Sequence, residues 1–168
     1  IGKILKSEIK DIGIPKKGTP QGGIISPLLA NICMNEFDWW LSNQWETFKT
    51  EYKYCNLSNR YRSLKKSNLK EFYFVRYADD FKIFCKDYET ARKLFIGSKM
   101  WLKDRLGLEI SEEKSKITNI RKNYTEFLGF KLKGIINKNK VVCISKMNDK
   151  AKKKVIKNIK NQVKKIQK

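Results

Sequence analysis

The sequence contains no histidine and only seventeen acidic residues among 168, and each shortage excludes a class of chemistry. Without histidine the chain lacks the commonest general base, so carboxylates, lysines or metal ions remain for any reaction. The four cysteines lie far apart with no C-x-x-C pair. This spacing argues against a zinc site and against a disulfide framework, and a reducing compartment is the simpler expectation.

Long apolar runs and signal-like segments are also missing, so no membrane partner is expected. The shortage of acids contrasts with 38 Lys and Arg residues, which give a formal charge of +21. A compact chain with this charge repels itself unless a polyanion neutralises it, and nucleic acid is therefore the expected partner. The alternative is a basic surface that serves only solubility. Because the chain starts at Ile1 rather than Met, we expect a cut or processed boundary with a segment before it.

The first apolar pattern predicts a helix that starts at Ser26 and Pro27 and continues to about Leu41. Ser26 is expected to cap the first backbone N–H groups, and proline suits the first helical position. Apolar residues then follow a period near 3.6 and are expected in the core. They are Leu28, Leu29, Ile32, Cys33, Phe37, Trp40 and Leu41. The stretch 44–70 has no clean period, and we interpret it as a basic connecting insertion.

Residues 72–85, with the sequence FYFVRYADDFKIFC, predict a β-hairpin because two aromatic and β-branched runs flank a short acidic centre. Asp79 and Asp80 are expected at its turn or next to it. Residues 87–106 recover a helical period, and Gly107 fits just beyond the end of that helix.

The last third of the chain predicts less regular structure followed by a helix. Residues 109–120 are expected to form a strand or loop, while 127–132 and 141–145 are expected to pair as a second hairpin. Residues 146–168 hold ten lysines and one acid, with apolar residues at helical spacing. They predict a basic amphipathic helix.

The adjacent carboxylates of Asp79 and Asp80 are the strongest chemical signal in the sequence. Like charges at the tip of an apolar hairpin repel each other unless a cation lies between them. Mg²⁺ is the expected cation, because it prefers carboxylate oxygens, keeps several waters and is completed by substrate phosphates. The alternative is an ordinary solvated turn.

Longer motifs around these carboxylates resemble those of reverse transcriptases. The stretch 75–81, VRYADDF, is similar to the group II intron form of the YxDD signature. Residues 18–32, GTPQGGIISPLLANI, resemble the motif before the long palm helix nearly residue for residue. Further along, SEEK at 111–114 resembles the next palm motif and FLGF at 127–130 resembles the primer-grip motif. The resemblance spans Gly18 to about Gly134.

The resemblance implies an α/β fold of the α+β palm type, in which two helices back an antiparallel sheet that contains the YADD hairpin. Residues 1–145 would form a partial palm, and 146–168 a basic helical extension that begins the thumb. The implied activity is RNA-directed DNA polymerisation with paired Mg²⁺ ions about 3.5–4 Å apart. Its substrates would be an RNA template, a DNA primer and deoxynucleoside triphosphates (dNTPs). A maturase role in intron splicing and mobility is implied as well.

The resemblance also implies roles for individual residues. Asp79 would be the principal metal ligand, Asp80 part of the same carboxylate cluster, and Lys114 a cation near the triphosphate. Residues expected at the nucleotide and template are Pro20, Gln21, Gly22 and Tyr77. Those expected to hold the primer end, through a tight turn at Gly129, are Phe127, Leu128, Gly129 and Phe130. Phosphate contacts to RNA are expected from Arg60, Arg62, Lys65 and Lys66.

One catalytic element of the family is missing from the sequence. The palm has another metal-binding aspartate on a strand before the G-x-P-Q-G-G motif, whereas Asp11 is too close to Gly18 and in the wrong context. We therefore expect no polymerase activity from this chain alone. Three interpretations stay open: a fragment, a split half completed by an upstream polypeptide, or an inactive relic that binds RNA in a ribonucleoprotein. The abundance of Lys, Asn and Ile suggests a bacterial cytoplasm or an organelle matrix.

Overall fold

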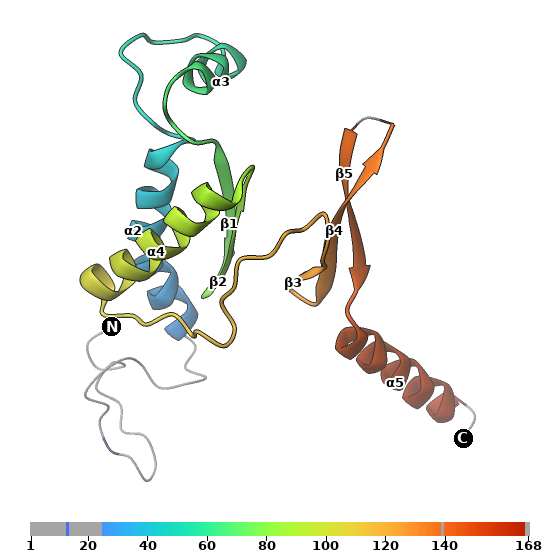
Figure 1. Ribbon diagram of the computed structural model, residues 1–168. Helices are drawn as coiled ribbons and strands as arrows, with labels where there is room; N and C mark the ends of the chain where they lie inside the picture. Colours follow the sequence, from blue (N-terminus) through green and yellow to red (C-terminus); the bar gives the residue numbers. More distant parts are fainter. Residues whose placement is uncertain (1–12, 14–24, 139, 167–168) are drawn as a thin grey trace. The chain divides into compact units, whose positions relative to one another are not determined.

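The computed structural model describes residues 13, 25–138 and 140–166, which contain four helices and five strands (Figure 1). The chain divides into two compact units, residues 1–110 and 111–168. Helices α2, α3 and α4 and the hairpin β1–β2 belong to the first unit. Strands β3, β4 and β5 and helix α5 belong to the second. The division expected between palm and thumb at 145–146 stays a prediction.

Helix α2, Ser26–Gln44, begins at the predicted place but with a different cap. Ile25 occupies the N-cap position without a side-chain cap bond, so the capping role expected of Ser26 is wrong. The reason is that Ile25 already has helical backbone angles, and its carbonyl accepts the first helical bond from the Leu29 N–H at 3.0 Å. Pro27 lies in the first turn as predicted.

The core of the first unit lies on only one face of α2. Met34, Phe37 and Leu41 are buried there, at the spacing of one helical stripe. The ring of Phe37 lies 5.1 Å from that of Phe81 in the hairpin and 5.5 Å from that of Trp101 in α4. The remaining buried apolar residues are Trp45, Leu64, Phe72 and Leu102.

Three residues expected in the core are exposed instead. Leu28 and Ile32 are 58% and 60% exposed, and Cys33 is exposed as well. Apolar side chains occur on more than one face of α2, and only the face toward Phe81 and Trp101 is packed. Apolar periodicity alone does not distinguish these faces.

The connecting insertion contains a helix that the sequence pattern did not predict, α3 at Leu57–Lys66. The Asn56 side chain caps it by accepting a bond from the Ser58 N–H at 2.9 Å. Leu64 is buried in the core and anchors the helix. A single buried residue in a short polar helix leaves too weak a periodic signal to detect.

The predicted hairpin is confirmed as β1, Phe72–Tyr77, paired antiparallel with β2, Asp80–Cys85. Helix α4, Tyr88–Leu106, follows as predicted. Its cap Asp87 accepts a bond from the Thr90 N–H at 2.8 Å, and Gly107 ends it with φ +62°. Both helices contact the hairpin, which fits the expected palm arrangement.

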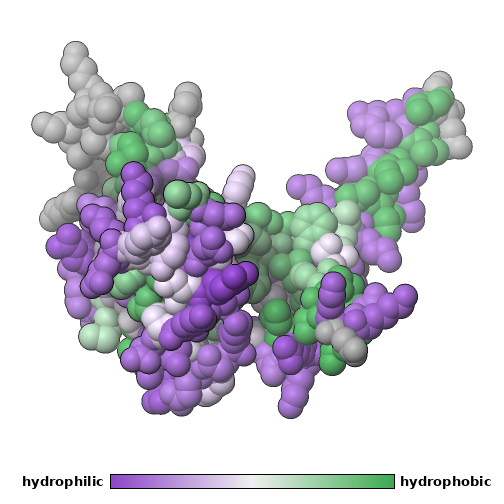
Figure 2. Space-filling model, turned by 90° about the horizontal axis from the view of Figure 1, so that it is seen from above, coloured by the Kyte–Doolittle hydropathy of each residue, from purple (hydrophilic) through white to green (hydrophobic). Residues whose placement is uncertain are grey.

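The second unit contains an antiparallel sheet of order β3–β4–β5, with β3 at Thr125–Phe127, β4 at Phe130–Asn137 and β5 at Lys140–Met147. The strand expected at 127–132 is therefore broken by a turn. Helix α5, Asp149–Ile166, is confirmed as basic and amphipathic, and none of its described residues is buried. Figure 2 shows its apolar side chains as a strip along the arm that ends in the grey C-terminal residues.

The predicted mixed α/β class with antiparallel sheets is confirmed, although the described strands form two sheets rather than one. Within the same described ranges, no helix has the length and apolar character needed to cross a membrane.

Candidate active site

The two candidate catalytic carboxylates lie at the tip of the β1–β2 hairpin. Tyr77 pairs with Asp80 across the hairpin, so Ala78 and Asp79 form the turn and Asp80 begins β2. The prediction that both carboxylates lie at or next to the turn is confirmed. Asp79 and Asp80 are exposed, and Tyr77 is 65% exposed. The acidic tip is therefore open to solvent, while the strands behind it pack on α2.

The backbone of the turn adopts an unusual conformation. Ala78 has φ +52°, in the left-handed region that favours glycine. Its carbonyl accepts a hydrogen bond of 2.7 Å from Arg76 Nη1. A strained residue of this kind persists where surrounding contacts hold it, so the bond from Arg76 contributes directly to the shape of the YADD turn.

Arg76 also binds two side chains of α2. Its Nε and Nη2 donate to the two carboxylate oxygens of Asp38 at 2.8 and 2.6 Å, and Nη1 donates to Asn31 Oδ1 at 3.0 Å. Hydrogen bonding to Asp38 raises the pKa of Arg76, and the guanidinium stays charged. Sequence reasoning missed Arg76, Asp38 and Asn31 as functional candidates. The available signal was a single arginine inside the apolar FYFVRY strand.

The carboxylates suit part of a Mg²⁺ site but do not complete one. Asp79 and Asp80 supply hard oxygen ligands, and Mg²⁺ takes its remaining ligands from water and substrate phosphates. Among the residues that the structure describes, no group of three or more Cys, Asp or Glu side chains is placed to hold a metal ion. The donor set thus fits Mg²⁺ only together with ligands from outside these residues.

The first part of the motif at 18–32, residues 18–24, lies outside the described residues. It includes the predicted site residues Pro20, Gln21 and Gly22, whose roles stay predictions. Helix α2 contains the end of this motif, including Asn31, and carries both side-chain partners of Arg76. The covalent chain therefore joins the motif to the helix on which the YADD hairpin is fixed.

The primer-grip candidate lies in the second unit as the turn between β3 and β4. Phe127 pairs with Phe130, and Leu128 and Gly129 form the turn with φ +49° and +81°. The tight turn expected at Gly129 is confirmed. Glycine adopts a φ of this kind without strain. Leu128 and Phe130 are about half exposed, at 47% and 48%. The turn thus presents apolar surface, and its contact with a primer stays a prediction.

Asn148 anchors this turn to the start of α5, a role that sequence reasoning missed. Its backbone N–H donates to the Gly129 carbonyl at 2.8 Å, and its side-chain oxygen caps α5 by accepting from the Ala151 N–H at 2.8 Å. The side-chain amide also donates to Glu126 at 3.2 Å. An asparagine just before a basic amphipathic helix was the available signal.

Lys114, the cation expected near the triphosphate, also belongs to the second unit. Its N–H donates to the Ser111 carbonyl at 3.3 Å in a short turn, and its side chain is exposed. The motif SEEK therefore lies in a loop, in agreement with one of the expected alternatives. The role of Lys114 stays a prediction.

The four basic residues proposed for RNA phosphates all lie on α3, but their side chains differ in availability. Arg60 donates to the carbonyls of Glu46 and Phe48 and so holds the insertion together. Lys65 forms an ion pair with Glu71 at 3.0 Å. The remaining two, Arg62 and Lys66, are exposed and are the better candidates for phosphate contacts.

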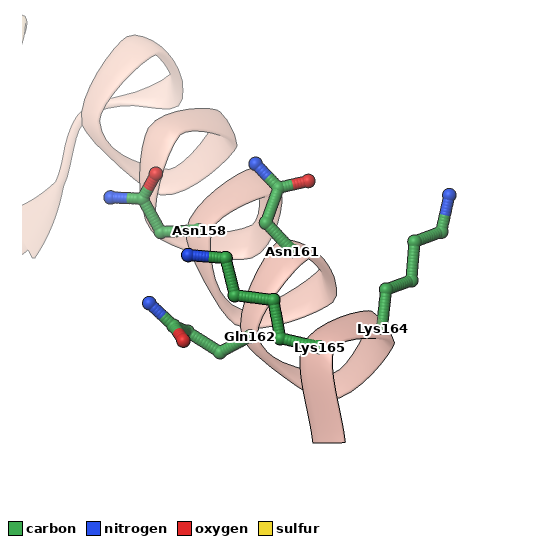
Figure 3. Close-up of a pocket in the computed structure, with 5 residues that line it drawn as sticks. All are labelled: Asn158, Asn161, Gln162, Lys164 and Lys165. Atoms are coloured by element: carbon green, nitrogen blue, oxygen red, sulfur yellow. The ribbon is translucent and has the colours of Figure 1, made fainter. Parts of the chain in front are cut away.

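A depression on α5 is not a candidate ligand site. Its volume is about 540 Å³, and side chains of a single helix line it (Figure 3). Ligand sites are usually concave and enclosed by several elements with apolar walls. The polar side chains in Figure 3 project outward from one helix, namely Asn158, Asn161, Gln162, Lys164 and Lys165.

An antiparallel hairpin with two exposed aspartates at its tip, packed against two helices, fits the palm-type fold. Comparison with known protein families agrees with this class. The model of the family described as reverse transcriptase (RNA-dependent DNA polymerase) matches residues 6–132. The chain therefore belongs to the reverse transcriptase family.

Similar proteins include group II intron-encoded proteins. Protein YkfC of Escherichia coli is 31% identical over 77% of this chain and 37% of its own length. The group II intron-encoded protein LtrA of Lactococcus lactis is 30% identical over 69% of the chain and 26% of its own length. The putative COX1/OXI3 intron 2 protein of Saccharomyces cerevisiae is 29% identical over 69% and 17%. The chain thus spans well under half the length of these relatives.

Proposed function

We propose that this chain supplies the catalytic hairpin of an RNA-directed DNA polymerase of the group II intron type. One observation carries the proposal: Asp79 and Asp80 lie exposed at a hairpin tip that is fixed on α2, in a chain of the reverse transcriptase family. Exposed carboxylates at a rigid tip suit metal-dependent nucleotidyl transfer, because this chemistry depends mainly on positioning and charge stabilisation.

Asp79 is the principal Mg²⁺ ligand in this proposal, and Asp80 contributes to the same carboxylate cluster. When bound, Mg²⁺ supplies activation of the primer hydroxyl and stabilisation of the departing pyrophosphate. A further carboxylate comes from a segment or polypeptide that contains the aspartate motif preceding G-x-P-Q-G-G. The contacts of the hairpin with α2 fix the position of Asp79 and Asp80 along that helix.

The other site residues take the roles that their motifs suggest. Gln21, between Pro20 and Gly22, contacts the incoming dNTP and the template, and Tyr77 borders the same nucleotide. Lys114 neutralises the triphosphate, and the turn at Gly129 supports the DNA primer end. Arg62 and Lys66 contact RNA phosphates, which strengthens binding without reading sequence.

The whole protein would act on the intron RNA as well as on a template. This part of the proposal rests on relatives named as group II intron-encoded and intron proteins. The large positive charge of the chain, +21, favours binding to a long polyanion. A bacterial cytoplasm or an organelle matrix is the proposed location, in keeping with relatives from bacteria and from yeast introns.

Primer extension on an RNA template with Mg²⁺ tests the proposal. The comparison includes the chain alone, the chain joined to a segment with the fingers and first aspartate motif, and the same assembly with Asp79→Ala. We expect DNA synthesis only from the assembly, and its loss in Asp79→Ala. Tight RNA binding without extension in every combination would instead support an inactive RNA-binding protein of a ribonucleoprotein.

A further inference from the structure

We propose that Arg76, Asp38 and Asn31 form a positioning network that sets the YADD turn on α2 and thereby aligns Asp79 and Asp80. This inference rests on the proposed polymerase function. Arg76 is a positioning residue rather than a catalytic one, because it acts on the turn through the Ala78 carbonyl.

The guanidinium of Arg76 binds three residues at once, two on α2 and one in the turn. It forms a bidentate pair with Asp38 at 2.8 and 2.6 Å, and its Nη1 reaches Asn31 at 3.0 Å and the Ala78 carbonyl at 2.7 Å. A guanidinium is a rigid planar fork, so bonds to several of its nitrogens fix direction as well as distance. The turn is thereby tied to two points of α2.

An apolar contact next to this network fixes the same register. Arg76 pairs with Phe81 across the hairpin, and the Phe81 ring packs on Phe37 at 5.1 Å. Phe37 and Asp38 are neighbours on α2. One polar and one apolar contact therefore hold facing residues of the hairpin to adjacent residues of the helix. A shift of the hairpin along α2 would break both contacts.

Burial separates this pair from the ordinary ion pairs of the surface. The side chains of Arg76 and Asp38 are 11% and 27% exposed, so water competes little for their bonds. Arg105 and Glu36 form another pair with α2, but their atoms are 3.9 Å apart and their side chains are 67% and 63% exposed. Exposed pairs of this kind contribute little. The pair of Arg105 on α4 and Glu36 on α2 is therefore a matched control.

Alignment of the carboxylates should affect the chemical step more than substrate binding. A displacement of reacting groups by about 1 Å lowers rates on the order of 100-fold. Arg76→Lys keeps a positive charge but loses the fork, and with it the tie to Ala78. Arg76→Lys combined with Asp38→Glu restores an ion pair of suitable length but not the hydrogen bond to the Ala78 carbonyl. Only a positioning role predicts that the double variant stays impaired.

The test measures single-nucleotide extension by the assembled polymerase, together with hydrogen exchange at residues 77–81. In Arg76→Lys, with or without Asp38→Glu, we expect kcat to fall about 10- to 100-fold while KM for the dNTP changes less than about threefold. Exchange at the turn should become faster. Arg105→Lys and Glu36→Gln should leave both measurements near wild type.

Several outcomes overturn the inference. Wild-type kcat despite faster exchange at the turn would limit Arg76 to a structural role, and an equal loss in Arg105→Lys would remove its specificity. If Arg76→Lys unfolds the first unit, Asn31→Ala decides, because its side chain is exposed. A fall in the kcat of Asn31→Ala that is smaller than the one expected for Arg76→Lys supports the network, and an unchanged kcat contradicts it. A wild-type assembly that extends no primer contradicts the proposed function itself.

Discussion

The two units of the chain differ in how they are stabilised. All the buried apolar side chains among the described residues belong to the first unit, where Phe37, Leu41 and Trp45 have no exposed surface. In the second unit most apolar residues of β4, β5 and α5 are exposed, as Ile136 at 75% and Ile159 at 57% illustrate. The first unit thus has a hydrophobic core of its own, whereas local turns and caps define the second.

This difference suits the functions proposed for the two units. A catalytic hairpin needs fixed geometry, and an aromatic core with a partly buried Arg76–Asp38 pair provides it. Exposed apolar surface on the second unit is of the kind that other protein segments or nucleic acid cover. Variants in each unit therefore test whether the two units are stabilised in these different ways.

The largest expected effect is the loss of a core ring from the first unit. Phe37→Ala should destabilise it by about 3–5 kcal/mol, because the side chain is fully buried between the hairpin and α4. All four tryptophans, at positions 39, 40, 45 and 101, lie in this unit, so urea unfolding followed by tryptophan fluorescence reports it selectively. Ile32→Ala on the exposed part of α2 is the control. A loss under about 1 kcal/mol for Phe37→Ala would contradict the account.

The next effect concerns the turn of the second unit. Gly129→Ala places a side chain at φ +81° and should destabilise the β3–β4 turn by about 1–3 kcal/mol. The new Cβ would lie 3.7 Å from Ala151, an ordinary contact, so backbone strain is the cause. Hydrogen exchange of β3 and β4 measures it. Gly97→Ala is the matched control, because Gly97 lies within α4 and its new Cβ meets only Trp40 at 3.6 Å. Equal effects of both substitutions would refute this explanation.

A smaller effect is expected where the turn meets α5. Asn148→Ala removes the cap of the helix and the side-chain bond to Glu126, and should destabilise this junction by about 1 kcal/mol. Faster hydrogen exchange in the first turn of α5 measures it. Asn158→Ala, in the same helix but away from the cap, should leave that exchange unchanged. If both substitutions act alike, Asn148 is not the anchor.

The smallest effect is a pH dependence of the first unit at the start of α4. Backbone and side-chain bonds from Thr90 lower the pKa of Asp87 from its ordinary value of 3.8. A depressed folded-state pKa stabilises the fold above pH 3.8, and this contribution is lost as the pH falls below that value. Asp87→Asn keeps a capping side chain that does not titrate. As the pH falls below about 4, the stability of this variant, measured by thermal unfolding, should therefore decline less than that of the wild type. Parallel curves for the two proteins would exclude this role of Asp87.

The sequence predicted the elements whose signals are local. The hairpin around Asp79, the stop at Gly107 and the turn at Gly129 each depend on residues close in the chain. Tertiary contacts decided the rest. Leu28 and Ile32 fit the periodic pattern of α2, but the packed face is the one that meets Phe81 and Trp101.

The same distinction explains the site. Asp79 and Asp80 form a recognisable local pattern, whereas Arg76 and Asp38 are 38 residues apart in sequence and only the fold brings them together. Asn148 and Gly129 likewise meet only through the fold, at 2.8 Å. Arg76 lies within the VRYADDF motif, but the motif does not reveal its partner Asp38.

The most direct test of the catalytic assignment is the rate of single-nucleotide incorporation by the assembled polymerase with Asp79→Asn. The substitution keeps the shape of the side chain and removes the charge proposed to bind Mg²⁺, so a loss of several kcal/mol of transition-state stabilisation, or about a thousandfold in rate, is expected. Asp104→Asn, at an exposed position near the end of α4, should retain the wild-type rate. A rate for Asp79→Asn within about tenfold of wild type would contradict the assignment of this hairpin as the metal-binding centre.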